Sequence, residues 1–139
     1  MTEGEIKKPL RILVVEDDSA TRESVFFKLQ KMGFTADEAE DGRMALEKLR
    51  ADSSYAGVLL DLRLPQKDGF VFLEEKKNDP AFDHIPVLVF SNVGQPQYVK
   101  RTLDLGAKGF LVKAFHSIDE IAEEVRMCFV ENKCSIDYE

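Results

Sequence analysis

Four apolar runs of this sequence end in residues that are able to do chemistry. The carboxylate Asp61 follows the run 56–60 and precedes the turn 64–69. A buried charge costs free energy unless it is paired, so a carboxylate at the end of a buried strand needs a partner. The other three runs end in an acidic triplet, a serine with an asparagine, and a lysine: Glu16–Asp17–Asp18, Ser91–Asn92 and Lys113. If these runs are neighbouring parallel strands, the groups converge at one sheet edge and form a site.

The elements that must position these groups alternate along the chain. The predicted strands are about 11–15, 34–38, 57–61, 87–90 and 109–113, and the predicted helices are about 19–32, 42–51, 69–78, 96–105 and 118–129. Continuous apolar strands joined by helices predict a doubly wound parallel sheet with helices on both faces, which is a three-layer α/β sandwich. Such sheets bind ligands at the carboxyl ends of their strands, where all the groups above lie.

Sequence patterns of helix caps support the predicted helices. The segment Ser117–Ile118–Asp119–Glu120 has the pattern of a capping box. Behind it, apolar residues at helical spacing predict a buried face made of Ile118, Ile121, Val125 and Phe129. Asp68 is a predicted cap of the third helix.

Size and charge limit the class of protein. The 139 residues suit one domain, with residues 1–9 as a polar N-terminal arm, 10–131 as the domain and 132–139 as a short polar tail. The net charge of −7 argues against nucleic acid as a direct partner. The longest apolar runs are about five residues, short of the ~20 that span a membrane. The polar start is unlike a signal peptide.

The two cysteines, Cys128 and Cys134, have neither metal-ligand spacing nor the pattern of a disulfide framework. We therefore expect them to be reduced, in a cytoplasmic protein. His84 and His116 lie in predicted loops without a partner in spacing, so we assign them no ligand role.

Four segments together resemble the receiver domain of two-component response regulators, in its CheY-like single-domain form. They are residues 12–18, 60–69, 87–92 and 106–113, and the resemblance covers roughly residues 10–131. It implies a flavodoxin-like (βα)5 fold with strand order 2-1-3-4-5, an order carried over from the family.

The resemblance implies that Asp61 accepts a phosphoryl group from a histidine kinase or a phosphotransfer protein. Carboxylates do act as phosphoryl acceptors through an aspartyl phosphate. It also implies Mg²⁺ (or Mn²⁺), held by Asp17 and Asp61, by Glu16 through water, and by the backbone carbonyl of Arg63. Mg²⁺ prefers such oxygen ligands and keeps several waters.

The phosphoryl oxygens would be bound by Lys113, Ser91 and Asn92, again by resemblance. Lys113 would pair with Asp61 at rest and with the phosphoryl group afterwards. Ser91 and Phe110 would form the switch, the serine moving with its loop and the aromatic ring reporting the movement.

Each residue also has a purely structural interpretation. Asp18 and Ser19 suit helix capping, whereas for Asp17 we favour metal binding. Asp61 and Ser91 are also common turn residues, and Lys113 a common solvated strand end. Phe110 is a common core residue of a strand.

Three positions depart from the family pattern. Ala114 follows Lys113 where the family usually has a proline after a cis peptide bond. A cis bond before a non-proline residue costs about 3–4 kcal/mol, so we predict a trans Lys113–Ala114 bond and an altered loop before Ser117. Glu16 replaces the commoner aspartate, and Phe110 replaces the commoner tyrosine.

The predicted function is a phosphorylation-driven switch with self-phosphorylation and autodephosphorylation activity, without a following output domain. Its expected output is binding of a downstream protein or onward phosphorelay, through the face of the fourth helix, fifth strand and last helix. That face also allows a homodimer, and its polar residues are Tyr98, Lys100, Arg101, Asp104 and Lys108.

Three other classes are weighed against this function. A constitutive interaction module would keep the fold with an unused site. A flavodoxin-like cofactor binder would need a phosphate-cradling loop after the first strand, where this chain has carboxylates. A phosphatase would need a second carboxylate two residues after Asp61, where the sequence has Arg63.

Overall fold

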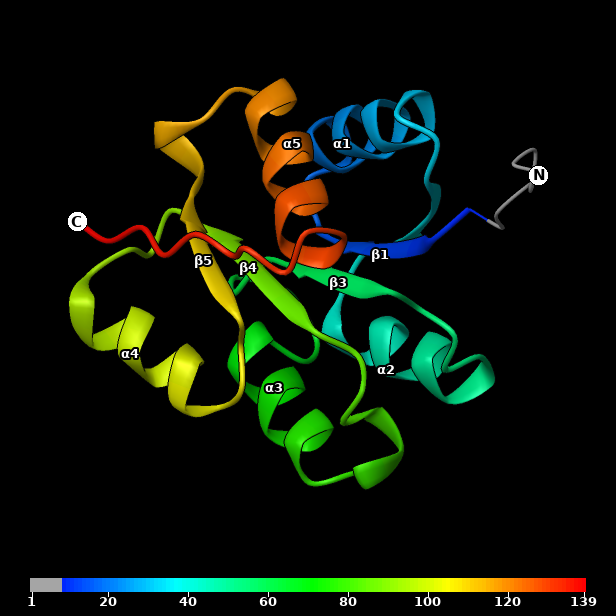
Figure 1. Ribbon diagram of the computed structural model, residues 1–139. Coiled ribbons are helices and arrows are strands. Elements are labelled where there is room, and N and C mark those ends of the chain that lie inside the picture. The colour runs from blue at the N-terminus through cyan, green and yellow to red at the C-terminus, as the bar shows by residue number, and fades with distance from the viewer. Residues whose placement is uncertain (1–8) are drawn as a thin grey trace.

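Residues 9–139 are described by a computed structural model (Figure 1). The predicted N-terminal arm, residues 1–9, lies almost entirely outside this range. The strands are β1 (Arg11–Val15), β2 (Thr35–Ala39), β3 (Gly57–Leu60), β4 (Val87–Ser91) and β5 (Gly109–Val112). The α-helices are α1 (Ser19–Lys31), α2 (Gly42–Ala51), α3 (Gly69–Lys77), α4 (Pro96–Asp104) and α5 (Ile118–Phe129). Short 3₁₀ helices occupy Pro80–Phe82 and Lys113–Phe115.

The five strands form one parallel sheet in the order β2-β1-β3-β4-β5, which confirms the predicted fold. Helices α1 and α5 cover one face of the sheet, and α2, α3 and α4 cover the other (Figure 1). Each face has its own apolar core, because strands buried on both sides direct alternate residues to opposite faces. Among residues 9–139, no helix has the length and apolar composition needed to cross a membrane.

The capping predictions for Ser117, Asp18 and Asp68 are confirmed, whereas Ser19 is the first residue of α1 and not its cap. The Ser117 side chain accepts from the Glu120 N–H, and the Glu120 side chain accepts from the Ser117 N–H. At α1 and α3 the cap is a single bond: the Asp18 side chain accepts from the Thr21 N–H, and the Asp68 side chain accepts from the Val71 N–H. On α5 the buried residues are Ile121, Ala122, Val125 and Cys128, while Ile118 and Phe129 are only partly buried.

Several predicted boundaries were wrong by one residue. The second strand begins at Thr35, not Phe34, and the third ends at Leu60, so Asp61 lies just beyond it. The fifth ends at Val112, because Lys113 begins a 3₁₀ turn. The Lys113–Ala114 peptide bond is trans, as predicted.

The expectation of two reduced cysteines was wrong for this structure, in which a disulfide joins Cys128 to Cys134. The chain turns back after α5 at Asn132, whose φ of 59° lies in the left-handed region. The Lys133 N–H then donates to the Met127 carbonyl at 2.9 Å, which brings Cys134 beside the helix end. Residues 135–139 continue from there along the free edge of β5 (Figure 1).

Candidate functional site

The carboxyl ends of β1 and β3 place two carboxylates side by side. Glu16 and Asp61 directly follow these adjacent strands. Backbone hydrogen bonds continue the sheet past the strand ends: the Glu16 N–H donates to the Ala39 carbonyl, and the Asp61 N–H to the Val15 carbonyl, both at 3.0 Å. Both side chains are therefore held inside the protein, 1% and 7% exposed respectively.

Glu16, Asp17 and Asp61 form an acidic cluster. Each offers one carboxylate oxygen, and these atoms all lie within 4.8 Å of one another. Three carboxylate oxygens gathered in this way are the kind of donor set that Mg²⁺ prefers, so the chemistry of the cluster suits this ion. Asp17 is exposed, which leaves an open side for waters or a phosphoryl oxygen.

Lys113 compensates the two buried carboxylates. Its Nζ donates to Asp61 Oδ2 at 3.0 Å and to Glu16 Oε1, and it lies 4.8 Å from the centre of the Phe90 ring. The lysine side chain is 20% exposed. The predicted pairing of Lys113 with Asp61 is thus present, while its second bond, to Glu16, was not predicted.

Burial and the charges of the neighbouring groups together set the ionisation of this cluster. It raises the pKa of Glu16 to about 7, assisted by the Asp61 charge and opposed by the hydrogen bond from Lys113. Burial alone would lower the pKa of Lys113, but attraction by Asp61 and Glu16 outweighs it and raises that pKa. The lysine is therefore an ammonium throughout the neutral range.

Ser91 and Asn92 lie at the end of β4, and their side chains already bond to backbone. The buried Ser91 hydroxyl accepts from the Val93 N–H at 3.1 Å. The Asn92 side-chain oxygen accepts from the Ala114 N–H at 3.0 Å, which ties this loop to the turn after β5. The amide group of Asn92 still carries two donors.

Phe110 is fully buried in the core between the sheet and helices α2, α3 and α4. This position agrees with the structural interpretation of the residue. Its role as part of a switch stays a prediction.

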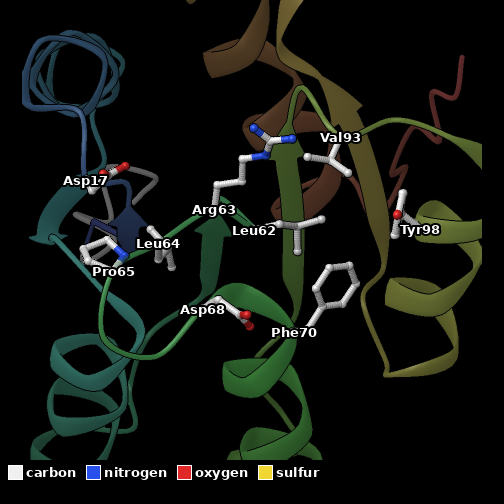
Figure 2. Close-up of a pocket in the computed structure, with 9 residues that line it drawn as sticks. All are labelled: Asp17, Leu62, Arg63, Leu64, Pro65, Asp68, Phe70, Val93 and Tyr98. Atoms are coloured by element: carbon white, nitrogen blue, oxygen red, sulfur yellow. The ribbon is translucent and has the colours of Figure 1, made fainter.

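A pocket of ≈ 580 Å³ opens beside the acidic cluster (Figure 2). Asp17 and Pro65 lie on one side of it and Phe70 and Tyr98 on the other, with Arg63 between them. The Arg63 N–H faces Asp61 Oδ1 at 3.4 Å, so the residue predicted to offer a backbone carbonyl does adjoin the cluster. The remaining lining residues are Leu62, Leu64, Asp68 and Val93.

Arg22 is a residue of the site that the sequence did not reveal. It donates to the Glu16 backbone carbonyl at 2.9 Å and to the Glu38 carboxylate at 3.0 Å. It thereby fixes the loop that carries the acidic cluster. No sequence signal marks it, because an arginine on an amphipathic helix is usually a solvated residue.

Comparison with known proteins gives a consistent result. The sequence model of the response regulator receiver domain matches residues 12–126. The chain is 35% identical to the response regulator MprA of Mycolicibacterium vanbaalenii, over 85% of this chain and 49% of MprA. It is 31% identical to a gliding motility regulatory protein of Myxococcus xanthus, over 90% of this chain and 16% of that protein. The chain thus spans half or less of the length of these curated relatives.

Among solved structures, the chain is similar to CheY in the CheX–CheY–BeF₃–Mg²⁺ complex of Borrelia burgdorferi. The sequences are 28% identical, the TM-score is 0.79, and the match covers 87% of this chain and 90% of that one.

Proposed function

The chain belongs to the response regulator receiver domains of two-component signalling, and we propose that it is a phosphorylation-activated switch whose acceptor is Asp61. The observation that carries this proposal is the Lys113 ammonium, which bonds to Asp61 and Glu16 inside a cluster that fits Mg²⁺. A carboxylate held between a fixed cation and a metal site is arranged to receive a phosphoryl group, because phosphoryl transfer depends on positioning and charge stabilisation.

In the proposed reaction an oxygen of Asp61 attacks the phosphorus of a phosphohistidine on a kinase or phosphotransfer protein. An O–P bond forms, the P–N bond breaks, and the leaving imidazole takes up a proton. Mg²⁺ (or Mn²⁺), held by Asp17, Asp61, the Arg63 carbonyl and Glu16 through water, would neutralise charge on the phosphoryl oxygens. The similar CheY of Borrelia burgdorferi forms a complex with BeF₃ and Mg²⁺, which supports a metal in this receiver fold.

Lys113 then shifts from Asp61 to the phosphoryl oxygens. The Ser91 hydroxyl and the Asn92 amide bind the same oxygens. Before phosphorylation the Ser91 hydroxyl accepts from the Val93 N–H. Movement of the serine therefore draws the loop between β4 and α4 with it. Phe110 would repack in response. The face formed by α4, β5 and α5 (the α4–β5–α5 face) would pass the change to a downstream protein, to a second copy, or along a phosphorelay.

Water can attack the same phosphoryl group, so we expect slow autodephosphorylation. The proposal puts the domain in the cytoplasm beside the kinase. It includes no direct nucleic acid or membrane partner, since the chain carries a net charge of −7.

The test is the intact mass of the protein after incubation with Mg²⁺ and acetyl phosphate. We expect one added phosphoryl group, absent with a chelator, absent in Asp61→Asn and retained in the control Asp83→Asn, an exposed loop carboxylate. Mn²⁺ should replace Mg²⁺. If wild type gains no phosphoryl group and Mg²⁺ binding is undetectable by titration calorimetry, a constitutive interaction module replaces this proposal.

A further inference from the structure

Residues 135–139, here named the edge segment, lie against the open side of β5 and form an isolated parallel β-bridge there, between Ile136 and Phe110 (Figure 1). The Phe110 N–H donates to the Ser135 carbonyl at 3.0 Å, and the Asp137 N–H donates to the Phe110 carbonyl at 2.7 Å. An open sheet edge is a ready template for another strand. The edge segment therefore occupies the place where a partner strand would pair.

Side-chain and loop contacts extend this attachment. Asp137 Oδ2 accepts from the Val112 N–H at 3.1 Å and lies 2.6 Å from His116 Nε2. The Glu139 N–H donates to the Gly94 carbonyl at 2.8 Å. The edge segment thus contacts β5, the turn after it, and the loop between β4 and α4.

Little apolar surface holds the edge segment in place. Ile136 is 48% exposed and Tyr138 is 63% exposed. Both adjoin an open groove along α4 that is lined by Pro96, Val99, Lys100 and Leu103. Exposed polar contacts add little net stability. Docking of the edge segment onto β5 must therefore depend strongly on how the segment is tethered to the rest of the domain.

The disulfide supplies that tether at the residue just before the edge segment. Cys128 is buried in α5, and Cys134 immediately precedes Ser135. The closed loop removes most of the freedom of the intervening residues 129–133, which favours the docked segment over the released one. Disulfides of cytoplasmic proteins are commonly transient or redox-sensing.

We propose that Cys128 and Cys134 form a reversible thiol–disulfide site that latches the edge segment over β5 and so closes the α4–β5–α5 face. On reduction, one thiolate of a small dithiol attacks the partly exposed Cys134 sulfur, and the Cys128 sulfur leaves as a thiolate and takes up a proton. The second thiol of the reductant then displaces Cys134, and the reductant departs as a cyclic disulfide. Two electrons pass from the dithiol to the protein disulfide, and the released segment exposes the β5 edge.

Hydrogen exchange of individual amides, followed by NMR on unphosphorylated protein, tests this proposal independently of phosphorylation. In the oxidised protein the amides of Phe110 and Val112 should be protected. Dithiothreitol at the same pH should speed their exchange by roughly tenfold or more. The neighbouring Leu111 is the internal control: the N–H groups of Phe110 and Val112 point to the edge segment, and because backbone direction alternates along a strand, the Leu111 N–H points to β4, so its exchange should not change.

Variants separate the latch from the rest of the fold. Cys134→Ser, kept under oxidising conditions, should behave like the reduced wild type. Asp137→Asn should speed exchange at Val112, whereas the exposed Asp83→Asn should leave it unchanged.

Three results would each overturn the proposal. The first is two free thiols in protein isolated under oxidising conditions. The second is equal protection of Phe110 in the oxidised protein, the reduced protein and Cys134→Ser. The third is faster exchange at Leu111 to the same degree as at Phe110, because the cysteines would then act on the whole fold and not on the edge segment.

Discussion

Replacing Lys113 by methionine is the sharpest test of how charge is balanced in this site. The Nζ of Lys113 bonds to Asp61 at 3.0 Å and to Glu16, and both carboxylates are almost fully buried. Methionine keeps much of the apolar stem but removes the ammonium. Two neighbouring buried carboxylates are then left without their cation in a metal-free buffer.

The expected loss follows from the geometry. Two unit charges about 3 Å apart attract by about 5 kcal/mol at an effective dielectric constant of about 20. The variant also no longer bears the desolvation cost of burying an ammonium, which offsets part of the lost attraction. Removing one partner of a buried pair typically costs about 3–5 kcal/mol, and we expect a loss in that range. For a domain of this size the melting temperature should fall by roughly 10–15 °C.

The loss should depend on pH with a definite sign. The pKa of Glu16 is about 7 in the folded protein, above its ordinary value, and loss of the ammonium raises it further. A carboxyl group whose folded pKa is raised favours folding below its unfolded pKa, and that contribution disappears as pH rises through the folded pKa. The variant should therefore lose more stability at pH 8 than at pH 6, where Glu16 takes up a proton.

Urea unfolding with a chelator present measures these values. The double variant Asp61→Asn with Lys113→Met should regain much of the lost free energy, because one of the uncompensated carboxylates is gone. Lys100→Met is the matched control, since Lys100 pairs with Asp104 at the surface and such pairs contribute about 0–1 kcal/mol. A Lys113→Met loss below about 1 kcal/mol, or a double variant no more stable than the single one, would refute this account.

Three further predictions concern stability, measured by urea unfolding. Burial alone would raise the pKa of Asp37, but hydrogen bonds from a tyrosine and an arginine lower it. Asp37→Asn should therefore cost about 1–2 kcal/mol of unfolding free energy at pH 7. The difference in free energy between wild type and variant should shrink as pH falls below about 4, because the wild type then loses the same contribution. A constant difference down to pH 2 would contradict this. Gly57→Ala should cost about 1–3 kcal/mol, because its Cβ would clash with the Phe129 ring. Phe129→Leu in the same chain should recover part of the loss, and no recovery would mean that the ring is not the cause. Ser117→Ala should cost about 1 kcal/mol by removing half of the capping box, and an unchanged free energy of unfolding would exclude that role.

Much of the fold and of the candidate site could be predicted from the sequence. Apolar runs identified four of the five strands, the alternation of strands and helices pointed to the weaker strand at 34–38, and the order 2-1-3-4-5 came with the family resemblance. Because the carboxyl ends of parallel strands share one edge, the meeting of Glu16, Asp61 and Lys113 was predictable. The bond between Lys113 and Glu16 was not, since it depends on side-chain directions at strand ends. The anchoring of the acidic loop by Arg22 was missed for the same reason.

The course of residues 132–139 was the least predictable part of the chain. A polar tail was expected, but the structure pairs it with β5 and joins Cys134 to Cys128. His116, to which no role was assigned, lies against Asp137. None of these contacts has a periodic pattern that marks it in the sequence.

The sequence by itself determined the layers of the fold, the edge that carries the chemistry and the residue types gathered there, because apolar periodicity and turn residues act locally. Only the tertiary structure decided that Lys113 also balances Glu16 and what covers β5. Edge pairing uses backbone N–H and C=O groups that nearly every residue carries, so side-chain type does not encode it. The chain reversal at Asn132 and the resulting disulfide depend on where the end of α5 comes to lie, and packing of the whole domain sets that position.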